Sequence, residues 1–396
     1  MDRSVVMLVD GPIGQDRRVL SAIDAYRDLG YAVQVIDVLD GRRRPSLRAW
    51  VMAACAVIKA LPGLPRFFRA TKRHRALAYR PWRLGVALHQ TCLETLSMVA
   101  RGLELRQTVA GASLVHANDL KALIVAWAGG ATNILYDSHE LNLFMNRRGV
   151  QLPRIFLNFA LESVSWKRVR NVITISPPIR DFLLDAYGDK PLAVVENDFY
   201  RSAADIEARC EESGAEPLEF LFFGSFNTGR GIGHLVRLLQ LVPEVRGRLV
   251  LMGDEALNRQ RLHKAFPQGV PSNLLVTFDV TDTSGYIASL PPGRRYGWVC
   301  NEDICLSYRY SLPNKFFQSV RLGLPMVAMA ETYLGTLVTD NRLGRILRAD
   351  DLDSADSARA FVDALEAGFA QGNAAAEAFE PRTTGYRTAL DRLLKP

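Results

Sequence analysis

Short runs of apolar residues alternate with stretches of helical periodicity along the first half of the chain. Residues Ser4–Val9 form an apolar run that ends in an Asp-Gly-Pro turn. The stretch Arg17–Leu29 then places its apolar side chains on one helical face, and Gly30 closes it. Further apolar runs follow at Tyr31–Val38, Leu114–Ala117, Asn133–Tyr136, Val172–Ile175 and Ala193–Val195. Strands that are apolar on both faces and separated by helices predict a parallel, doubly wound α/β sheet.

The same pattern restarts after a polar, acidic stretch from about 200 to 217, which we interpret as a linker. Phe220–Phe223 is predicted as a strand, Gly224–Gly231 as a glycine-rich loop and Gly233–Leu241 as a helix. Further strands are predicted at Leu249–Met252, Leu275–Phe278, Tyr296–Val299 and Met326–Ala330. The sequence therefore predicts two Rossmann-like domains, 1–200 and 218–396, and a helical tail, Ser357–Leu394, that packs back across the molecule. Because such sheets bind ligands at the carboxyl ends of their strands, we expect the domains to face each other across a cleft.

Length and composition agree with two soluble domains. A chain of 396 residues, 48% hydrophobic and 23% charged, is too long for one ordinary core and too polar for a membrane-embedded protein. Its five cysteines are scattered without a Cys-x-x-Cys pair, so a reducing compartment fits and a zinc site is not expected. The first residues are predicted as a strand, with no secretory signal. The longest apolar stretch, Ala49–Leu61, is interrupted by Lys59 and is shorter than the ~20 residues of a spanning helix. We therefore expect a cytoplasmic protein without a membrane-spanning segment.

Positive charge is concentrated in one insert of the N-terminal domain, residues 41–93. The net charge is +7, yet this insert holds 12 Lys or Arg and no Asp or Glu, whereas the rest of the chain has 37 basic and 42 acidic residues. The basic side chains are interleaved with Trp50, Phe67, Phe68, Tyr79 and Trp82. This combination predicts a peripheral contact with an anionic membrane surface, the inner face of the cytoplasmic membrane. A solvated helical hairpin is the alternative. No nucleic acid is expected as a partner, because no recognition motif accompanies the charge.

Two segments of the second domain carry candidate phosphate chemistry. The loop Gly224–Gly231 follows a strand and opens a helix, so its backbone amides and Arg230 could hold a phosphate, although a packing role is equally compatible. Further along, Asn314 stands at the expected N-cap of a helix that ends at Gly323, and Lys315 lies in its first turn. The helix dipole opposes a lysine there, which indicates that an anion shares the site. The alternative is a capped helix with a solvated lysine.

The segment from Glu302 to Pro325 resembles the donor-binding signature of the family-4 type of GT-B glycosyltransferases from bacterial capsule, exopolysaccharide and O-antigen pathways. Within it, Tyr308–Lys315 reads YRYSLPNK and Gly323-Leu324-Pro325 follows, as that family's pattern has them. Further matches occur in the family's order over nearly the whole chain, at Asp16-Arg17-Arg18-Val19, Val115–Asp119 (VHAND), Tyr136–Glu140 (YDSHE), Ile173–Ser176, Asn197 and Gly224–Gly231.

The resemblance implies a retaining glycosyltransferase of bacterial surface polysaccharide synthesis that needs neither a metal nor a cofactor. A nucleoside-diphosphate sugar, UDP- or GDP-linked, would bind the C-terminal domain, and a lipid-linked or saccharide acceptor the N-terminal domain. The implied donor and phosphate residues are Gly224, Ser225, Arg230, Asn314, Lys315 and Gln318, the last at the ribose. The implied acceptor-side residues are Gly14, Asp16, Asp119, His139 and Glu140. The implied catalytic residues are His116 and Glu302, with Glu302 near the donor sugar hydroxyls.

Three positions depart from the family's usual pattern. Gln318 replaces a glutamate, Ser307 an asparagine, and Ser225 an arginine that many relatives carry. An amide offers one acceptor where a carboxylate could accept from both ribose hydroxyls. Two other functions stay open, a nucleotide-sugar epimerase of the same fold and a non-catalytic nucleotide-binding scaffold of a polysaccharide-assembly complex. The membrane-facing insert argues against the epimerase, because a soluble substrate needs no such surface.

No other motif predicts a different chemistry. Asp351-Leu352-Asp353 has the DxD form that other transferases use for a metal, but it lies in an acidic run that we interpret as a solvated loop. The isolated histidines His74, His89, His234 and His263 are interpreted as structural or exposed.

Overall fold

The chain folds into two compact units, each described here by itself. The structure is a computed structural model that describes residues 4–11, 16–40, 45–74, 88–145, 152–197, 216–291, 293–380 and 385–395. The first unit comprises Met1–Asp198, Ile304–Tyr310 and Arg382–Pro396. The second comprises Phe199–Asp303 and Ser311–Pro381. The first unit therefore includes two segments from the second half of the sequence. The linker predicted at about 200–217 falls almost wholly outside the described residues.

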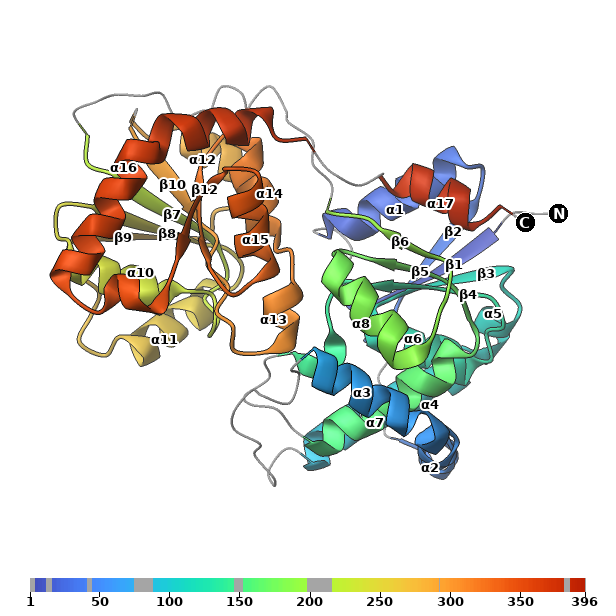
Figure 1. Cartoon of the computed structure of the whole chain (residues 1–396). Helices are drawn as coiled ribbons and strands as arrows, with labels where there is room; N and C mark the ends of the chain where they lie inside the picture. The colour runs from blue at the N-terminus through green and yellow to red at the C-terminus, as the bar shows by residue number, and fades with distance from the viewer. Residues whose placement is uncertain are drawn as a thin grey trace. The chain divides into compact units, whose positions relative to one another are not determined.

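The first unit is built on a six-stranded parallel sheet with the order β2-β1-β3-β4-β5-β6 (Figure 1). Its strands are β1 (Ser4–Val9), β2 (Ala32–Asp37), β3 (Leu114–Asn118), β4 (Ile134–Ser138), β5 (Val169–Thr174) and β6 (Leu192–Val194). The strand order reverses between β1 and β3. At such a switch point the connections that follow the two strands run to opposite sides, so a crevice forms at the carboxyl ends of the strands.

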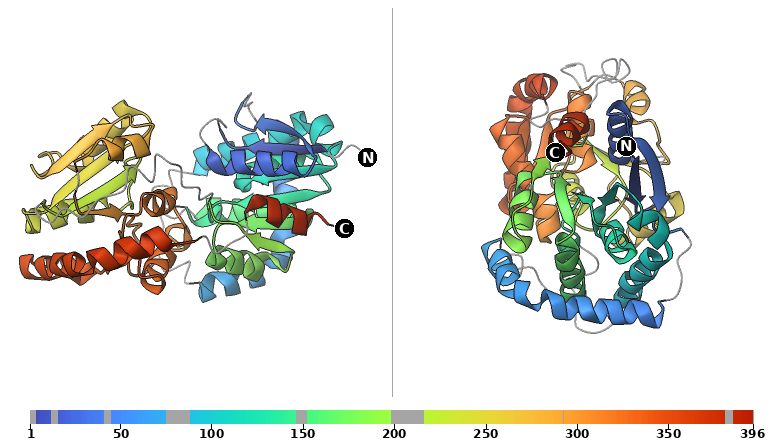
Figure 2. Two further views of the ribbon diagram at one scale, coloured as in Figure 1. Left: turned by 90° about the horizontal axis from the view of Figure 1, so that it is seen from above. Right: turned by 90° about the vertical axis from the view of Figure 1, so that its right-hand side faces the viewer.

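The helices of the first unit either cover the two faces of the sheet or pack on other helices. They are α1 (Arg17–Asp28), α2 (Leu47–Ala60), α3 (Leu64–Arg73), α4 (Leu88–Glu104), α5 (Arg106–Ala110), α6 (Asp119–Gly129), α7 (Leu152–Trp166), α8 (Pro177–Tyr187), α13 (Leu306–Tyr310) and α17 (Tyr386–Leu393). Helix α1 begins where the carboxylate of Asp16 accepts from the backbone N–H groups of Arg18 and Val19, at 3.1 and 3.2 Å. Met7 of β1, Ile23 of α1 and Leu390 of α17 share one core. The end of the chain thus packs beside α1 on the first unit, as Figures 1 and 2 show in red and blue.

The predicted insert contains a nearly continuous helical segment, Leu47–Arg73, in which a 3₁₀ turn at Leu61–Gly63 joins α2 to α3. Four of the alanines of α2 are buried where the helix crosses α7 and α4 (Figure 2): Ala49, Ala53, Ala56 and Ala60. In the described part of the chain, this is the one helix that is long and apolar enough to cross a membrane by length and composition alone. Its most apolar window has a mean hydropathy of 1.5 and is 22% buried. The helical segment therefore continues through Lys59 and is longer than the apolar stretch Ala49–Leu61, on which the expectation of no membrane-spanning segment was based.

The second unit is also built on a six-stranded parallel sheet, with the order β12-β11-β10-β7-β8-β9. Its strands are β7 (Glu219–Gly224), β8 (Arg246–Leu251), β9 (Leu274–Phe278), β10 (Arg295–Trp298), β11 (Met326–Met329) and β12 (Gly344–Leu347). Counted along this unit, the order is 3-2-1-4-5-6, which is that of a dinucleotide-binding Rossmann domain. The order reverses between β7 and β10, so the switch point lies where the glycine-rich loop and the segment after Trp298 leave the sheet.

The core of the second unit lies on both faces of β7, because successive side chains of a strand point to opposite sides. Phe220 and Phe222 pack in a cluster with Leu235 of α10 (Ile232–Leu241) and Phe361 of α16 (Ala355–Ala378). Leu221 and Phe223 pack on the other face. The remaining helices are α11 (Glu255–Ala265), α12 (Thr283–Ala288), α14 (Asn314–Arg321) and α15 (Tyr333–Asp340). Two parallel sheets flanked by helices confirm the predicted α/β class.

Candidate functional site

The loops after β7 and β10 are bound closely together at the switch point of the second unit. Gly231 precedes α10 with a φ of 73°, and a Cβ there would lie 2.5 Å from the Cβ of Cys300. Trp298 Nε1 donates to the carbonyl of Gly231 at 2.8 Å, and the backbone N–H of Glu302 donates to Gly229 at 2.9 Å. Only glycine combines this close approach with left-handed backbone. The glycines therefore bring the N-terminus of α10 against the segment that contains Glu302.

Lys315 is the buried cation of this region. Its side chain lies in the first turn of α14, is 4% exposed, and donates from Nζ to the carbonyl of Cys300 at 3.4 Å. Burial, together with the neighbouring charge of Arg230, holds the pKa of Lys315 well below its ordinary value. Among the described residues, no carboxylate forms an ion pair with Lys315. The predicted pair Arg230 and Lys315 is thus brought together, and an anion would relieve the unfavourable burial of positive charge.

Glu302 belongs to the same site, together with a histidine that sequence reasoning left aside. The backbone N–H of Gly231 donates to Glu302 Oε1 at 3.2 Å, and His234 Nδ1 lies 3.7 Å from the same oxygen. His234 lowers the pKa of Glu302 and outweighs burial, which raises it. His234 is therefore not isolated, as its position in the sequence had indicated. It follows the glycine-rich loop by three residues, and that spacing places it in the first turn of α10.

The other predicted donor residues lie on helix α14 and in the glycine-rich loop after β7. The N-cap of α14 is Pro313 and not Asn314, which is the first helical residue and is exposed. The predicted N-cap was therefore wrong by one position. Gln318 is half-buried, four residues after Asn314 on the same helix. Ser225 follows Gly224 and is exposed, and its hydroxyl donates to the carbonyl of Met252 at 3.3 Å.

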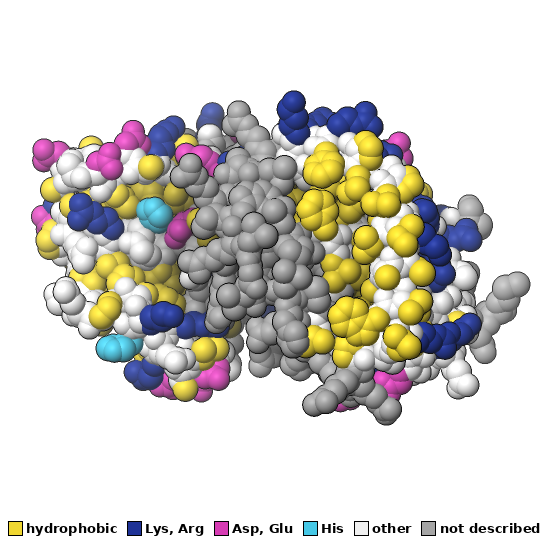
Figure 3. All heavy atoms as spheres, turned by 90° about the horizontal axis from the view of Figure 1, so that it is seen from below, with side chains coloured by type: hydrophobic (Ala, Val, Ile, Leu, Met, Phe, Trp, Pro, Cys, Tyr) yellow, Lys and Arg dark blue, Asp and Glu magenta, His cyan; other side chains and the backbone are white. Residues whose placement is uncertain are grey.

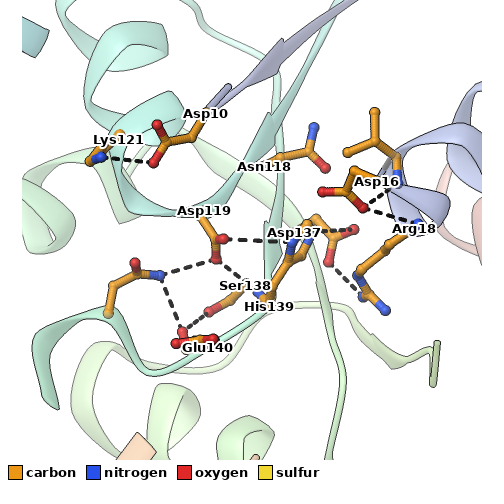
Figure 4. Close-up of polar contacts among 12 residues, drawn as sticks. Asp10, Asp16, Arg18, Asn118, Asp119, Lys121, Asp137, Ser138, His139 and Glu140 are labelled. Carbon is orange, nitrogen blue, oxygen red and sulfur yellow. Dashed lines mark hydrogen bonds and ion pairs between the residues drawn. The ribbon is translucent and has the colours of Figure 1, made fainter. Parts of the chain in front are cut away.

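A cavity opens at the switch point of the first unit, at the carboxyl ends of β1 and β3 (Figure 4). It contains about 320 Å³ of empty space, part of it open to solvent. Its lining residues are Val9, Asp10, Gly11, Asp16, Val19, Asn118, Asp119 and His139. Three of the predicted acceptor-side residues, Asp16, Asp119 and His139, thus lie together. Of the other two, Glu140 is half-buried beside the cavity, and Gly14 lies outside the described residues.

Asp119 and His139 are fixed by contacts with each other. Asp119 has a φ of 64°, and its carboxylate accepts from the backbone N–H of His139 at 2.9 Å and from Asn142 Nδ2 at 3.1 Å. His139 Nδ1 lies 3.5 Å from the Asp119 carboxylate. Burial lowers the pKa of His139, but the charges of Asp119 and Asp137 outweigh it and raise the pKa overall. His139 therefore carries positive charge at a higher pH than an ordinary histidine.

A fully buried carboxylate, Asp137, supports the floor of this cavity. Its partners are Arg18 at 2.7 Å, His139 at 3.5 Å, His116 at 3.6 Å and the hydroxyl of Tyr386, which donates to it. Burial raises the pKa of Asp137, but these neighbours, Arg18 first, hold it well below its ordinary value. Asp137 is therefore ionised, and it ties β4 to α1 and to the C-terminal helix α17.

The predicted catalytic residue His116 contacts Asp137 beneath the cavity and does not line the cavity. Its side chain is fully buried, and its Nδ1 lies 3.1 Å from the hydroxyl of Tyr26. Burial lowers the pKa of His116. His116 does not reach the cavity because it lies inside β3, where α1 covers it. Asn118, two residues further along, stands at the end of the strand and lines the cavity.

Solved structures with the same architecture cover essentially the whole chain. Sucrose-phosphate synthase from Thermosynechococcus elongatus aligns with a TM-score of 0.64 at 14% identity, over 99% of this chain and 97% of that one. Anabaena HepE in complex with UDP aligns with a TM-score of 0.62 at 16% identity, over 99% and 98%. Trehalose 6-phosphate synthase from Burkholderia multivorans aligns with a TM-score of 0.60 at 12% identity, over 100% and 96%. No family model matches the sequence, and no curated protein matches it.

The chain has the GT-B fold. Two parallel six-stranded sheets and the full-length likeness to these glycosyltransferases establish that architecture. At such low sequence identities the structural similarity establishes the fold but not the substrates. The ligands of this chain depend on the residues of its own sites.

Among the described residues, no group of three or more His, Cys, Asp or Glu side chains could hold a metal ion. The DxD run lies at a short 3₁₀ helix, Ala349–Leu352, where the carboxylate of Asp351 accepts from the backbone N–H of Arg348. Asp351 therefore has a local structural role.

Sequence reasoning missed several residues of the GT-B sites. Asp10 and Asn118 stand at the ends of β1 and β3, so the rule that ligands bind at strand ends could have found them. Asp137 lies inside the YDSHE motif but was not singled out. No local sequence pattern indicated a role for Tyr386, because its partner Asp137 is 249 positions away in the sequence.

Proposed function

We propose that the chain is a retaining, metal-independent glycosyltransferase that moves a sugar from a nucleoside diphosphate to a lipid-linked or saccharide acceptor. The second unit would hold the donor and the cavity of the first unit would hold the acceptor. Bacterial surface polysaccharide synthesis, at the inner face of the cytoplasmic membrane, is the setting that we propose.

One observation carries the donor half of this proposal, the cation pair Arg230 and Lys315 at a switch point. The ammonium of Lys315 is buried near a guanidinium and forms no ion pair with a carboxylate of the described residues, so a bound anion would stabilise its charge. The N-terminus of α10 and the glycine-rich loop add backbone N–H groups there. A diphosphate fits this arrangement, because its charge grows when the bond to the sugar breaks and both cations can stabilise the leaving group.

The nucleotide is most simply a uridine diphosphate. Anabaena HepE, which shares the fold over its whole length, has been solved with UDP and with UDP-glucose. In this chain, Gly224 and Ser225 at the end of β7 and Asn314 at the start of α14 would adjoin the diphosphate. Gln318, one turn further along α14, would contact the ribose, and Glu302 the sugar hydroxyls. These roles are proposals for the residues described above.

A second part of the proposal concerns the membrane, because the first unit carries an unusual apolar surface. Eight large apolar side chains are more than a third exposed on α2, the 3₁₀ turn, α3 and α7, and we call them the apolar face: Leu47, Trp50, Val51, Val57, Ile58, Leu61, Phe68 and Phe156. Figure 3 shows hydrophobic side chains gathered on this side, with Lys and Arg around them. Exposed Arg48, Lys59, Arg69 and Lys72 belong to the same helices. We infer that this surface enters the headgroup region of an anionic bilayer.

The helical segment Leu47–Arg73 would lie in the plane of the membrane and would not span it. Ala49, Ala53, Ala56 and Ala60 form a buried stripe that holds α2 against the first unit. A helix with one face packed on a folded unit cannot be surrounded by lipid. Lys59 and the basic residues of α3 can reach the headgroups from such a position, because their long side chains extend past the apolar surface.

The activity is tested with purified protein, a panel of UDP-, GDP-, CMP- and dTDP-sugars, and vesicles with or without an extracted lipid-linked acceptor. Sugar transfer that requires both a donor and the acceptor supports the proposal. Conversion of the donor without an acceptor would instead indicate the epimerase. Nucleotide binding without turnover under any condition would indicate the scaffold, and both of these outcomes contradict the transferase.

Membrane binding is tested by flotation with phosphatidylglycerol vesicles at two salt concentrations. We expect Trp50→Ser combined with Ile58→Ser to abolish flotation. Leu275→Ser is the matched control, since Leu275 is an isolated leucine, 48% exposed, on the second unit. Equal flotation of the double variant and the control would exclude the apolar face as the membrane contact.

A further inference from the structure

The cavity of the first unit is dominated by hydrogen-bond acceptors. The carboxylates of Asp10, Asp16 and Asp119 all line it, and so does the side chain of Asn118 (Figure 4). Carboxylates at neutral pH accept hydrogen bonds and donate none. A ligand that satisfies this surface must therefore bring donors, which hydroxyl and ammonium groups supply and carboxylate or phosphate groups do not.

The side chain of Asn118 is a second, independent indication that a ligand binds in this cavity. Its side chain is 3% exposed, and its Nδ2 donates to the carbonyl of Leu8 at 3.0 Å. Its Oδ1 is buried and has no hydrogen-bond partner among the described residues. A buried amide oxygen without a partner is costly, and native structures rarely retain one without a reason. Because Nδ2 is held by β1, the orientation of the amide is fixed with Oδ1 available to a donor.

Among the described residues, two cations contact carboxylates of the cavity, and each of the two is shared with a further carboxylate. Lys121 Nζ lies 2.9 Å from Asp10 and 3.0 Å from Glu94, so two carboxylates share one ammonium. His139 lies between Asp119 and Asp137, each at 3.5 Å. The carboxylate of Asp16 accepts only from backbone N–H groups in its described contacts. Negative charge therefore prevails at the cavity surface.

A metal ion does not account for these carboxylates. The described residues contain no group of three acidic or histidine side chains that converge on one point. The carboxylates are spread around the cavity, as would suit a ring with several hydroxyl groups and not a single cation.

We propose that this cavity binds a neutral or amino-bearing sugar ring and rejects rings that carry a carboxylate or a phosphate. This inference rests on the proposed transferase function and narrows it, because it names the chemical class of the acceptor group. Hydroxyl or ammonium donors of the ring meet Asn118 Oδ1 and the carboxylates of Asp16 and Asp119. A uronic acid or a sugar phosphate would place like charges together in a partly desolvated site, which weakens binding.

The test compares rings that differ from one another at a single charged substituent. Methyl glucoside, methyl glucosaminide and methyl glucuronide, with the corresponding galactose series, are titrated into the full-length protein and followed by saturation-transfer NMR at low ionic strength. We expect the neutral or amino ring of at least one series to bind at least tenfold more tightly than its uronate. A uronate that binds as tightly as its neutral partner, or no signal from any ring, would overturn the inference.

Two variants and a control test whether the residues of the cavity cause the preference against uronates. Asp16→Asn keeps an efficient N-cap for α1 while it removes a charge, so it should reduce the preference against uronates several-fold. Asn118→Ala should weaken the binding of every ring. Asp24→Asn is the matched control, since Asp24 lies on α1 with its side chain 72% exposed and is not a cavity residue. If Asp24→Asn changes the preference as much as Asp16→Asn, the cavity charge is not the cause.

The proposed function and the cavity inference can fail separately. UDP binding is measured on the same samples by thermal shift. A protein that binds UDP but shows no preference among the rings loses the cavity inference alone. A protein that shows the expected preference but does not bind or use any nucleotide keeps a sugar-binding cavity and loses the transferase proposal.

Discussion

The two switch points of this GT-B chain have the same topology and opposite charge. In the second unit the loops after β7 and β10 bring Arg230 and Lys315 together, and Lys315 is almost completely buried. In the first unit the loops after β1 and β3 bring Asp10, Asp16 and Asp119 to one partly open cavity. Parallel sheets place a crevice at this point, whatever their sequence. The residues that follow each strand therefore decide what each crevice can hold.

The contrast also extends to how each site is supported. The cations of the second unit are held by nearby loops, through glycines and the backbone of Cys300. The acidic cavity is supported by a buried charge network around Asp137, which draws on β4, α1 and the C-terminal helix. A change at the cation site of the second unit should therefore act mainly on ligand binding. A change in the charge network beneath the cavity of the first unit should act mainly on stability. The following predictions test that difference, in order of decreasing effect.

Removal of the buried cation should have the largest effect. We expect Lys315→Met to lower kcat/KM for transfer by about 10³-fold, since an electrostatic contact to the leaving group is lost in a site of low dielectric. The fold should be unchanged, because the substitution removes an unfavourable charge. Lys264→Met, on the exposed surface of α11, is the control. Comparable activity of the two variants would remove Lys315 from the donor site.

Loss of the central carboxylate of the first unit should destabilise the protein strongly. We expect Asp137→Asn to lower the free energy of unfolding by about 3 kcal/mol, because Arg18 remains buried without its counter-charge. Asp181→Asn breaks an exposed ion pair with Arg180 and should cost less than about 0.5 kcal/mol. Urea denaturation measures both.

The difference in stability between the wild type and Asp137→Asn should depend on pH. The pKa of Asp137 is lowered in the folded state, so its contribution to stability is present above the unfolded value of 3.8. It is lost as the pH falls below that value toward the lowered pKa. The stability difference between wild type and Asp137→Asn should therefore shrink below about pH 4. A difference that stays constant from pH 7 to pH 3 would contradict the assignment of the charge to Asp137.

The affinity for UDP should fall at alkaline pH. In the free protein the pKa of Lys315 is lowered, so its proton is lost earlier than that of an ordinary lysine. A bound diphosphate stabilises the proton, so Kd should rise by up to about tenfold per pH unit above the lowered pKa. Calorimetric titrations from pH 7 to pH 9 measure this slope. Lys315→Met should show no such slope, and an equally flat wild type would contradict the linkage.

The smallest effect is expected at the C-terminal helix. Tyr386→Phe removes the hydroxyl that donates to Asp137 but keeps the ring against Arg18. A loss of about 2 kcal/mol in the free energy of unfolding is expected for one buried hydrogen bond to a charged group. No change at all would mean that α17 is held by its apolar contacts alone. Methyl glycoside titrations of the same variant show whether the cavity depends on that helix.

The sequence predicted the sheets well, because strands depend on local patterns. Short apolar runs mark the strands. The glycine-rich loop directly follows one of them, and Asn314 and Lys315 begin a helix further along the chain after another. Even there, one detail was wrong. Pro313 takes the N-cap, since proline suits the extended backbone before a helix, and Asn314 moves one place inward.

The support of the acidic cavity could not be predicted in the same way. Arg18, His116, Asp137 and Tyr386 lie far apart in the sequence and meet only when the sheet and the last helix have formed. The family resemblance implied that His116 lines the acceptor side of the site. Two residues of strand separate it from the carboxyl end of β3, and α1 covers it. The pairing of His234 with Glu302 is non-local for the same reason.

The central claim is that the second unit binds its ligand through the diphosphate. Calorimetric titration of the wild-type protein with UDP and with uridine tests this claim most directly, because the two ligands share the base and the ribose and differ only in the phosphates. We predict that UDP binds at least 100-fold more tightly than uridine, which corresponds to roughly 2.7 kcal/mol. Equal affinities for UDP and uridine, or binding of neither, would contradict the account.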